Sequence, residues 1–442
     1  MRELTDKRAI RDWADVAMKF SEAAAAPLIA FVVYVLLHLV GIGMVIDGWA
    51  AWQGAVSLAT GHGYTYLSGE PVLSWPPLYP LYLAAWIFFT GPVGWSLIAA
   101  NAVLISAQAL CWYQLTRTIS IDSGLHQQPS TSYALSLFIG LYLNVLQWQV
   151  FAHNLVYVLL PLFLRSIWKC VATNKAHDTW GELALAIGLG SALMLTHHSC
   201  VAFIGAAALI VAVRQSSLAI GAVQALLLVT IPLGIWKLVR DSLNQAGSHL
   251  IGWGNGAYSV PEYVEQLIRG SGNLLVPDRY LASFAVVLFF AGITAWFFRS
   301  KKAAALRFGT AFVACSLAIF LAIFSVTWLA SPLNGRFLIY VPLLILPPLF
   351  ILARETAPKT AMMVAVLFIL PQAYWVTNWG TRQIRETLAE QGFPNDFALP
   401  NVYLSRSYLQ GPPVKTDRGI LISPFAFDDP FGKRTSEKPV EP

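Results

Sequence analysis

Long apolar runs without a charged side chain recur along the whole sequence. The first covers residues 27–46 (PLIAFVVYVLLHLVGIGMVI), which contain no Asp, Glu, Lys or Arg. A helix rises about 1.5 Å per residue, so such a run can cross a hydrocarbon layer about 30 Å thick. Charged residues make up 12% of the 442 residues, against roughly 25% in soluble domains. The sequence therefore predicts a polytopic membrane protein, with the first run retained as a helix.

Eleven runs are candidate membrane spans, and they predict an all-α bundle. The pair 183–197 and 199–213 is short, so a bent or re-entrant pair fits it as well. Segment 76–92 (PPLYPLYLAAWIFFTGP) is either a twelfth span or a helix lying in the membrane interface. The predicted spans are residues 27–46, 95–116, 131–149, 154–171, 183–197, 199–213, 217–237, 280–298, 308–329, 337–353 and 360–377.

The distribution of Lys and Arg predicts the topology. With the N-terminus inside, the basic clusters fall on the cytoplasmic side, as the positive-inside rule requires. The predicted outer loops 47–94, 150–153 and 330–335 hold no Lys or Arg, whereas outer loop 238–279 holds three. A twelfth span would invert every later loop and place the RSKK run outside. Eleven spans are therefore favoured, with segment 76–92 in the interface.

Composition narrows the remaining alternatives. In a membrane protein a net charge of +6 reports topology more than nucleic-acid binding. The four cysteines show no CxxC spacing, which argues against a disulfide framework or a zinc knuckle. We expect residues 1–378 to form the membrane domain and 379–442 a small extracytoplasmic segment with a disordered end. The lack of other targeting signals favours a bacterial inner membrane over the endoplasmic reticulum.

Asp47 closes the first apolar run and opens the first outer loop. We expect it at a helix C-terminus, where the helix dipole disfavours a negative charge. A carboxylate kept at such a place in a membrane protein is a functional candidate, although a simple helix stop would also put an acid there. Its balancing charge would come from a distant part of the chain, a metal or the substrate.

The rest of this loop predicts interfacial structure. Within residues 49–60 (WAAWQGAVSLAT), the side chains of Trp49, Trp52, Val56 and Ala59 share one helix face. Such a helix with few charges is suited to lie on the membrane surface. It is followed by a tight Gly-His-Gly turn at residues 61–63 and by a Gly-Glu-Pro turn that contains Glu70.

The order of these motifs resembles the GT-C glycosyltransferases, among them the protein O-mannosyltransferases, the lipid A aminoarabinose transferases and their bacterial relatives. The resemblance covers most of residues 27–350. Asn154 takes a place where the family often has an acid, and a histidine follows Leu-Thr where arginine is common. The matching segments are Asp47, residues 55–64 (AVSLATGHGY), 76–80 (PPLYP), 153–154 (HN), 195–198 (LTHH) and 336–342 (RFLIYVP).

The resemblance implies transfer of a sugar from a polyprenyl-phosphate donor to an extracytoplasmic glycan, lipid or protein. Asp47 would be the general base that takes the acceptor proton. The phosphate leaving group is already a stable anion, so it needs positive charge or a metal rather than a general acid. Arg336 is the leading phosphate partner, with a snorkelling interfacial arginine as the alternative. Arg269 in loop 238–279 is a further candidate.

Further polar residues on the outer face complete the predicted substrate site: His62, Tyr64, Glu70, His153, His197 and His198. Neighbouring residues on a helix point about 100° apart, so we expect at most one of His197 and His198 to face the site. A divalent metal is a candidate cofactor, with Asp47, Glu70 and His62 as its candidate ligands. No short HxxxH spacing supports a metal, and a hydrogen-bonded structural histidine is the commoner outcome.

Two other classes of membrane protein fit part of the pattern. A transporter or flippase of a lipid-linked sugar would show inverted repeats and charges deep within spans, and neither feature is evident. An enzyme resembling O-antigen ligases or polymerases would centre on loop 238–279. Alanine substitution across both loops distinguishes these interpretations, because the GT-C interpretation predicts greater sensitivity in the first loop.

Overall fold

The computed structural model describes the helical core of the chain and the segments that pack on one of its ends. In some helices and strands only the backbone is described, and Asp47 is one such residue. The described residues are 21–39, 41–44, 46–66, 69, 71–72, 75–92, 94–125, 129–146, 149–172, 176–215, 217–243, 261, 290–326, 338–374, 376, 401–404, 414–415 and 421–422.

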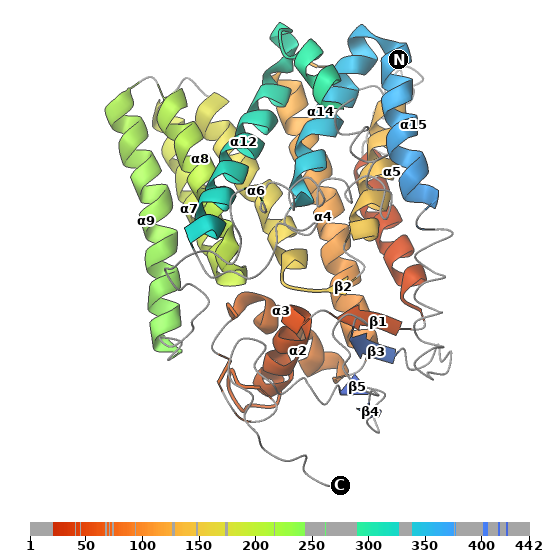
Figure 1. Ribbon diagram of the computed structural model, residues 1–442, viewed down its shortest axis with the longest axis vertical. Helices are drawn as coiled ribbons and strands as arrows, with labels where there is room; N and C mark the ends of the chain where they lie inside the picture. The colour runs from red at the N-terminus through yellow and green to blue at the C-terminus, as the bar shows by residue number, and fades with distance from the viewer. Residues whose placement is uncertain are drawn as a thin grey trace, which may run out of the picture.

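Long helices packed side by side form the bundle (Figure 1). Each predicted span overlaps a helical segment of the described residues, and five helices are long and apolar enough to cross a membrane. The prediction of a helical membrane protein is therefore confirmed, whereas the number of spans stays a prediction. The bundle helices are Ser21–Leu37, α4 (Gly94–Asp122), α5 (Pro129–Leu146), α6 (His153–Ala172), α7 (Ala176–Thr196), α8 (Val201–Arg214), α9 (Leu218–Ser242), residues 290–297, α12 (Ala304–Val326), α14 (Tyr340–Thr356) and α15 (Pro358–Tyr374).

The first apolar run is not one helix, so the prediction for 27–46 is wrong. Its helix, Ser21–Leu37, ends early, and the run continues as strand β1 (Gly41–Met44) before helix α2 (Ile46–Ala59) begins. Asp47 therefore lies in the first turn of α2 rather than at a helix C-terminus. Its electrostatic setting is the reverse of the expected one, because a helix N-terminus favours a carboxylate.

The early end of this helix has a local cause. His38 follows the last helical residue, and its ring Nδ1 bonds to the carbonyl of Tyr34 over 2.8 Å while the two rings stack 4.2 Å apart. This contact occupies a carbonyl of the last helical turn. Gly41 and Gly43 come next, and glycine costs about 1 kcal/mol in a helix interior. Paired neighbouring strands then make the extended conformation the favoured one.

These strands form a small parallel sheet in the order β2–β1–β3. Strand β1 pairs with β2 (Gln149–Val150) on one side and with β3 (Asn401–Leu404) on the other. A hairpin of β4 (Val414–Lys415) and β5 (Leu421–Ile422) lies at the same end of the molecule (Figure 1). The described part of the predicted tail therefore lies at the same end as the first loop. The predicted boundary at residue 378 falls outside the described residues.

Helices α2 and α3 (Leu78–Thr90) pack together at this end of the bundle (Figure 1). The prediction that α2 lies on the membrane surface is wrong, because Trp49 and Trp52 of its expected apolar face are buried within the protein. It is α3 that keeps an exposed apolar face, at Leu81, Phe88 and Phe89. With 13 residues, rising about 1.5 Å each, α3 is too short to cross a bilayer, which agrees with an interfacial position for 76–92.

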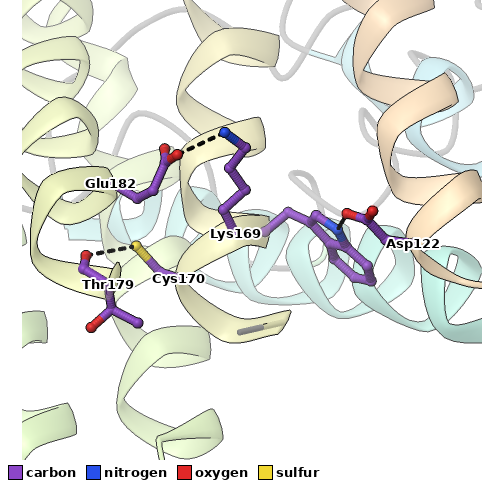
Figure 2. A network of polar contacts seen from close by, with 6 residues as sticks. Asp122, Lys169, Cys170, Thr179 and Glu182 are labelled. Carbon is purple, nitrogen blue, oxygen red and sulfur yellow. Dashed lines mark hydrogen bonds and ion pairs between the residues drawn. The ribbon is translucent and has the colours of Figure 1, made fainter. Parts of the chain in front are cut away.

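Polar contacts fix the opposite end of the bundle (Figure 2). Lys169 near the end of α6 pairs with Glu182 of α7 over 2.7 Å, and the adjacent Trp168 donates its indole N–H to Asp122 of α4 over 2.8 Å. Since α6 begins at the sheet, this network lies at the end of the bundle away from the sheet. In the predicted topology this end faces the cytoplasm.

One glycine sets the distance between two bundle helices and gives a first testable prediction. A Cβ atom added to Gly309 of α12 would lie 2.6 Å from the backbone oxygen of Leu344 in α14. Because backbone cannot yield as a side chain can, we expect Gly309→Ala to destabilise the fold by about 1–3 kcal/mol. Thermal unfolding in detergent would measure this. Gly188→Ala in α7 is the control, since its added Cβ meets nothing within 4 Å; equal shifts would contradict the prediction.

Candidate functional site

Two segments with predicted functional residues leave the same edge of the small parallel sheet. Strands β1 and β2 pair so that Met44 lies opposite Val150, and the chain then enters α2 and α6. Asp47 and His153 each follow three residues beyond this pair. Because the carboxyl ends of parallel strands meet at one edge, these two residues are brought together from distant parts of the sequence.

Three buried histidine rings pack on one another beside this edge. The ring centroids of His153 and His197 are 4.3 Å apart, and those of His197 and His198 are 4.6 Å apart. The three residues are 2%, 4% and 7% exposed, respectively. We call them the histidine stack. They join α6 to the α7–α8 connection, so three predicted site residues do form one cluster.

His197 and His198 are not on one helix, so the helical offset on which we expected at most one of them to face the site does not apply. Helix α7 ends at Thr196, and His197 is extended, with φ −159° and ψ 127°. A short 3-10 turn, η1 (His198–Cys200), then leads into α8. The extended residue removes the 100° helical offset, so both rings can stack nearly parallel, at 24°.

Ser199 fixes the proton position on the central ring. Its backbone N–H donates to His197 Nδ1 over 3.2 Å, and its hydroxyl Oγ lies 2.7 Å from the same nitrogen. A backbone N–H can only donate, so Nδ1 is the acceptor and the neutral ring carries its proton on Nε2. The sequence analysis missed Ser199, although a serine two residues after a histidine is a short-range signal for such a contact.

One end of the stack, His198, has an unsatisfied ring nitrogen. Among the residues that the structure describes, none bonds to His198 Nε2, although this atom is buried. His198 lies in the connection between the two predicted spans, and burial lowers the pKa of its ring to about 4. The ring is therefore neutral at pH 7, with one nitrogen as donor and the other as acceptor.

A buried amide network holds the start of α6 against α4 and α3. Asn154 Nδ2 donates to Asn101 Oδ1 over 2.8 Å, and the Tyr79 hydroxyl donates to the same oxygen over 3.0 Å. Gln108 Nε2 donates to the Asn154 carbonyl over 2.6 Å. Asn154, predicted to stand in the place of a family acid, is thus a hydrogen-bond donor inside the protein, next to His153.

The first loop reaches the stack through Trp75 rather than through His62. Trp75 lies 6.3 Å from His197 by ring centroids, and the Tyr64 hydroxyl donates to the Trp75 carbonyl over 2.8 Å. Burial raises the pKa of Tyr64 well above its usual value, so this hydroxyl stays a donor. His62 is exposed and its Nδ1 lies 2.9 Å from Thr60 Oγ1. The glycines on either side of it, at 61 and 63, both have positive φ and form the predicted turn.

Several predicted site residues fall outside this description. Glu70, Arg269 and Arg336 lie outside the described residues, as does the side chain of Asp47. Among the residues whose side chains are described, no group of three or more His, Cys, Asp or Glu is arranged to hold a metal ion. The metal candidates Asp47, Glu70 and His62 therefore stay a prediction.

Comparisons with known proteins give one structural likeness. No protein-family model and no curated protein sequence matches the chain. The crystal structure of the Archaeoglobus fulgidus oligosaccharyltransferase, in complex with Zn and sulfate, matches at 13% identity with a TM-score of 0.46. The match covers 85% of this chain and 58% of that chain, so this chain spans little more than half its length. At this level of similarity, the structural likeness carries no argument about the function.

Proposed function

We propose that the protein is a membrane glycosyltransferase of GT-C type that moves a sugar from a polyprenyl phosphate to an extracytoplasmic acceptor. The observation that carries this proposal is the parallel pairing of β1 with β2, which brings Asp47 and His153 to one sheet edge. That edge lies at the end of a bundle with helices apolar enough to cross a membrane. A lipid-linked donor is met at such a surface, where its chain stays in the hydrocarbon and its headgroup reaches the protein.

The chemistry follows from the groups at this edge. Asp47 takes the proton of an acceptor hydroxyl as that oxygen attacks the anomeric carbon of the sugar. The bond from the anomeric carbon to the phosphate oxygen breaks, and the polyprenyl phosphate leaves as an anion with inversion at the carbon. Arg336 is proposed to bind that phosphate. The tail strand β3 beside β1 and the loop 238–279 would contact the acceptor.

Purified protein in lipid vesicles tests this function. We expect it to convert a radiolabelled polyprenyl-phosphate sugar into free polyprenyl phosphate and a glycosylated acceptor, measured by thin-layer chromatography. A protein that instead moves the intact lipid-linked sugar across the bilayer, without breaking the glycosidic bond, would be a flippase. That outcome would overturn the proposal.

A further inference from the structure

The ring nitrogen Nε2 of His198 calls for a hydrogen-bond partner that the described part of the chain does not supply. His198 is 7% exposed, and among the described residues no group bonds to its Nε2. A buried polar atom left without a hydrogen bond destabilises the folded protein. Such atoms in native proteins call for an explanation, and a ligand is one. The same ring stacks on His197, which contacts His153 at the sheet edge.

The surroundings of this nitrogen favour an anion. Helix α6 begins at His153, and the helix that contains α8 begins at His198, so two helix N-termini meet at the histidine stack. Helix N-termini carry partial positive charge and attract anions. The N–H groups of Asn154 and Leu155 already bond to carbonyls one turn back. The helices therefore contribute an electrostatic field that favours an anion, and the ring nitrogens contribute the hydrogen bonds to it.

The geometry of the rings argues for hydrogen bonding rather than metal binding. Ligands of one metal ion direct their nitrogens at a common point. The rings of His197 and His198 instead lie nearly face to face, 4.6 Å apart and at 24°. Stacked rings present their nitrogens along neighbouring edges, which suits an anion with several oxygens. A phosphate group offers such oxygens and takes strong hydrogen bonds in a buried site.

We propose that the histidine stack binds the phosphate of the polyprenyl-phosphate donor and leaving group, with His198 Nε2 as one of the atoms that contact it. This inference rests on the proposed function and adds a phosphate site to it, built from the histidine rings and two helix N-termini. The stability cost of the unpaired nitrogen is then recovered when the phosphate binds. Arg336 and the stack would contact different oxygens of one group.

Binding to three probes tests the proposal without sugar transfer. Wild-type protein in nanodiscs is titrated with a polyprenyl phosphate, the matching polyprenol and inorganic phosphate, and the melting temperature is measured with and without each probe. We expect the polyprenyl phosphate to bind at least about tenfold more tightly than the polyprenol. Inorganic phosphate separates the two sources of the anion, because its binding would show that the protein recognises the phosphate group without the lipid. Equal binding of polyprenol and polyprenyl phosphate would overturn the phosphate site.

Matched variants assign the effect to His198. His198→Leu is expected to weaken polyprenyl-phosphate binding about tenfold or more and to leave the melting temperature of the unliganded protein unchanged or raised. His38→Leu, at a buried histidine whose Nδ1 already bonds to the protein, should lower the melting temperature and leave the affinity of the folded protein within about twofold. His198→Gln, which keeps a polar amide, should retain more binding than His198→Leu.

Two outcomes would overturn the role of His198. If His198→Leu binds polyprenyl phosphate as wild type does, the phosphate lies elsewhere while the proposed transferase stands. If His198→Leu lowers the melting temperature of the unliganded protein as much as His38→Leu does, His198 is a structural residue. Wild-type protein that binds no polyprenyl phosphate at all would refute the proposed donor together with the site.

Discussion

Replacing Asp47 with asparagine is expected to lower the rate of sugar transfer by about 10²–10⁴-fold, the contribution typical of a general base. The substitution keeps the shape of the side chain and removes its negative charge and its ability to take a proton. Asp47 lies in the first turn of α2, where an acidic side chain contributes about 0.3–1 kcal/mol through the helix dipole. The variant should therefore insert and fold normally, so that lost activity reports chemistry.

The matched control is Asp122→Asn at the other end of the bundle. Asp122 accepts a hydrogen bond from the Trp168 indole, and the asparagine oxygen can still accept it, so transfer should stay within about twofold of wild type. Full activity of folded Asp47→Asn protein would refute the mechanism.

The apolar runs predicted the approximate positions of the bundle helices. Each predicted span overlaps a helical segment of the described residues, because a helix in a membrane satisfies its own backbone and so depends on local composition. The same local logic predicted the turn at 61–63, where both glycines have φ +82°. Long-range pairing has no such local signature. Residues 41–44 resemble the end of a span, and only their partners at 149–150 and 401–404 make them a strand.

The candidate site was predicted in its residue types more than in its geometry. His153, His197 and His198 were all chosen from the sequence, but the helical offset wrongly separated the last two. A single extended residue at His197 changed which side chains could meet, and a helical pattern cannot reveal such a break. Trp75 and Asn101 were missed because each takes its role from a contact far away in the sequence, with His197 and with Asn154.

The substitution Asn154→Asp is expected to destabilise the fold by about 3–5 kcal/mol, the cost of an uncompensated buried charge. Asn154 is fully buried, and its amide nitrogen donates to Asn101 Oδ1. A carboxylate there would remove the donor and place two acceptors against each other. Asn101 cannot resolve this by turning its amide over, because its nitrogen bonds to the Leu97 carbonyl over 2.9 Å and its oxygen also accepts from Tyr79.

The partner substitution Asn101→Asp provides the control, because the direction of the bond makes the two sites unequal. An aspartate at 101 is also buried, and its second oxygen would face the Leu97 carbonyl, but it still accepts from Asn154 and from Tyr79, so its charge keeps two donors. Asn101→Asp should therefore lower the melting temperature clearly less than Asn154→Asp does. Protonation would give an aspartate at 154 a new donor, so its destabilisation should be smaller at pH 5 than at pH 8. A stable Asn154→Asp protein with faster sugar transfer would instead show that an acidic residue can function at this position.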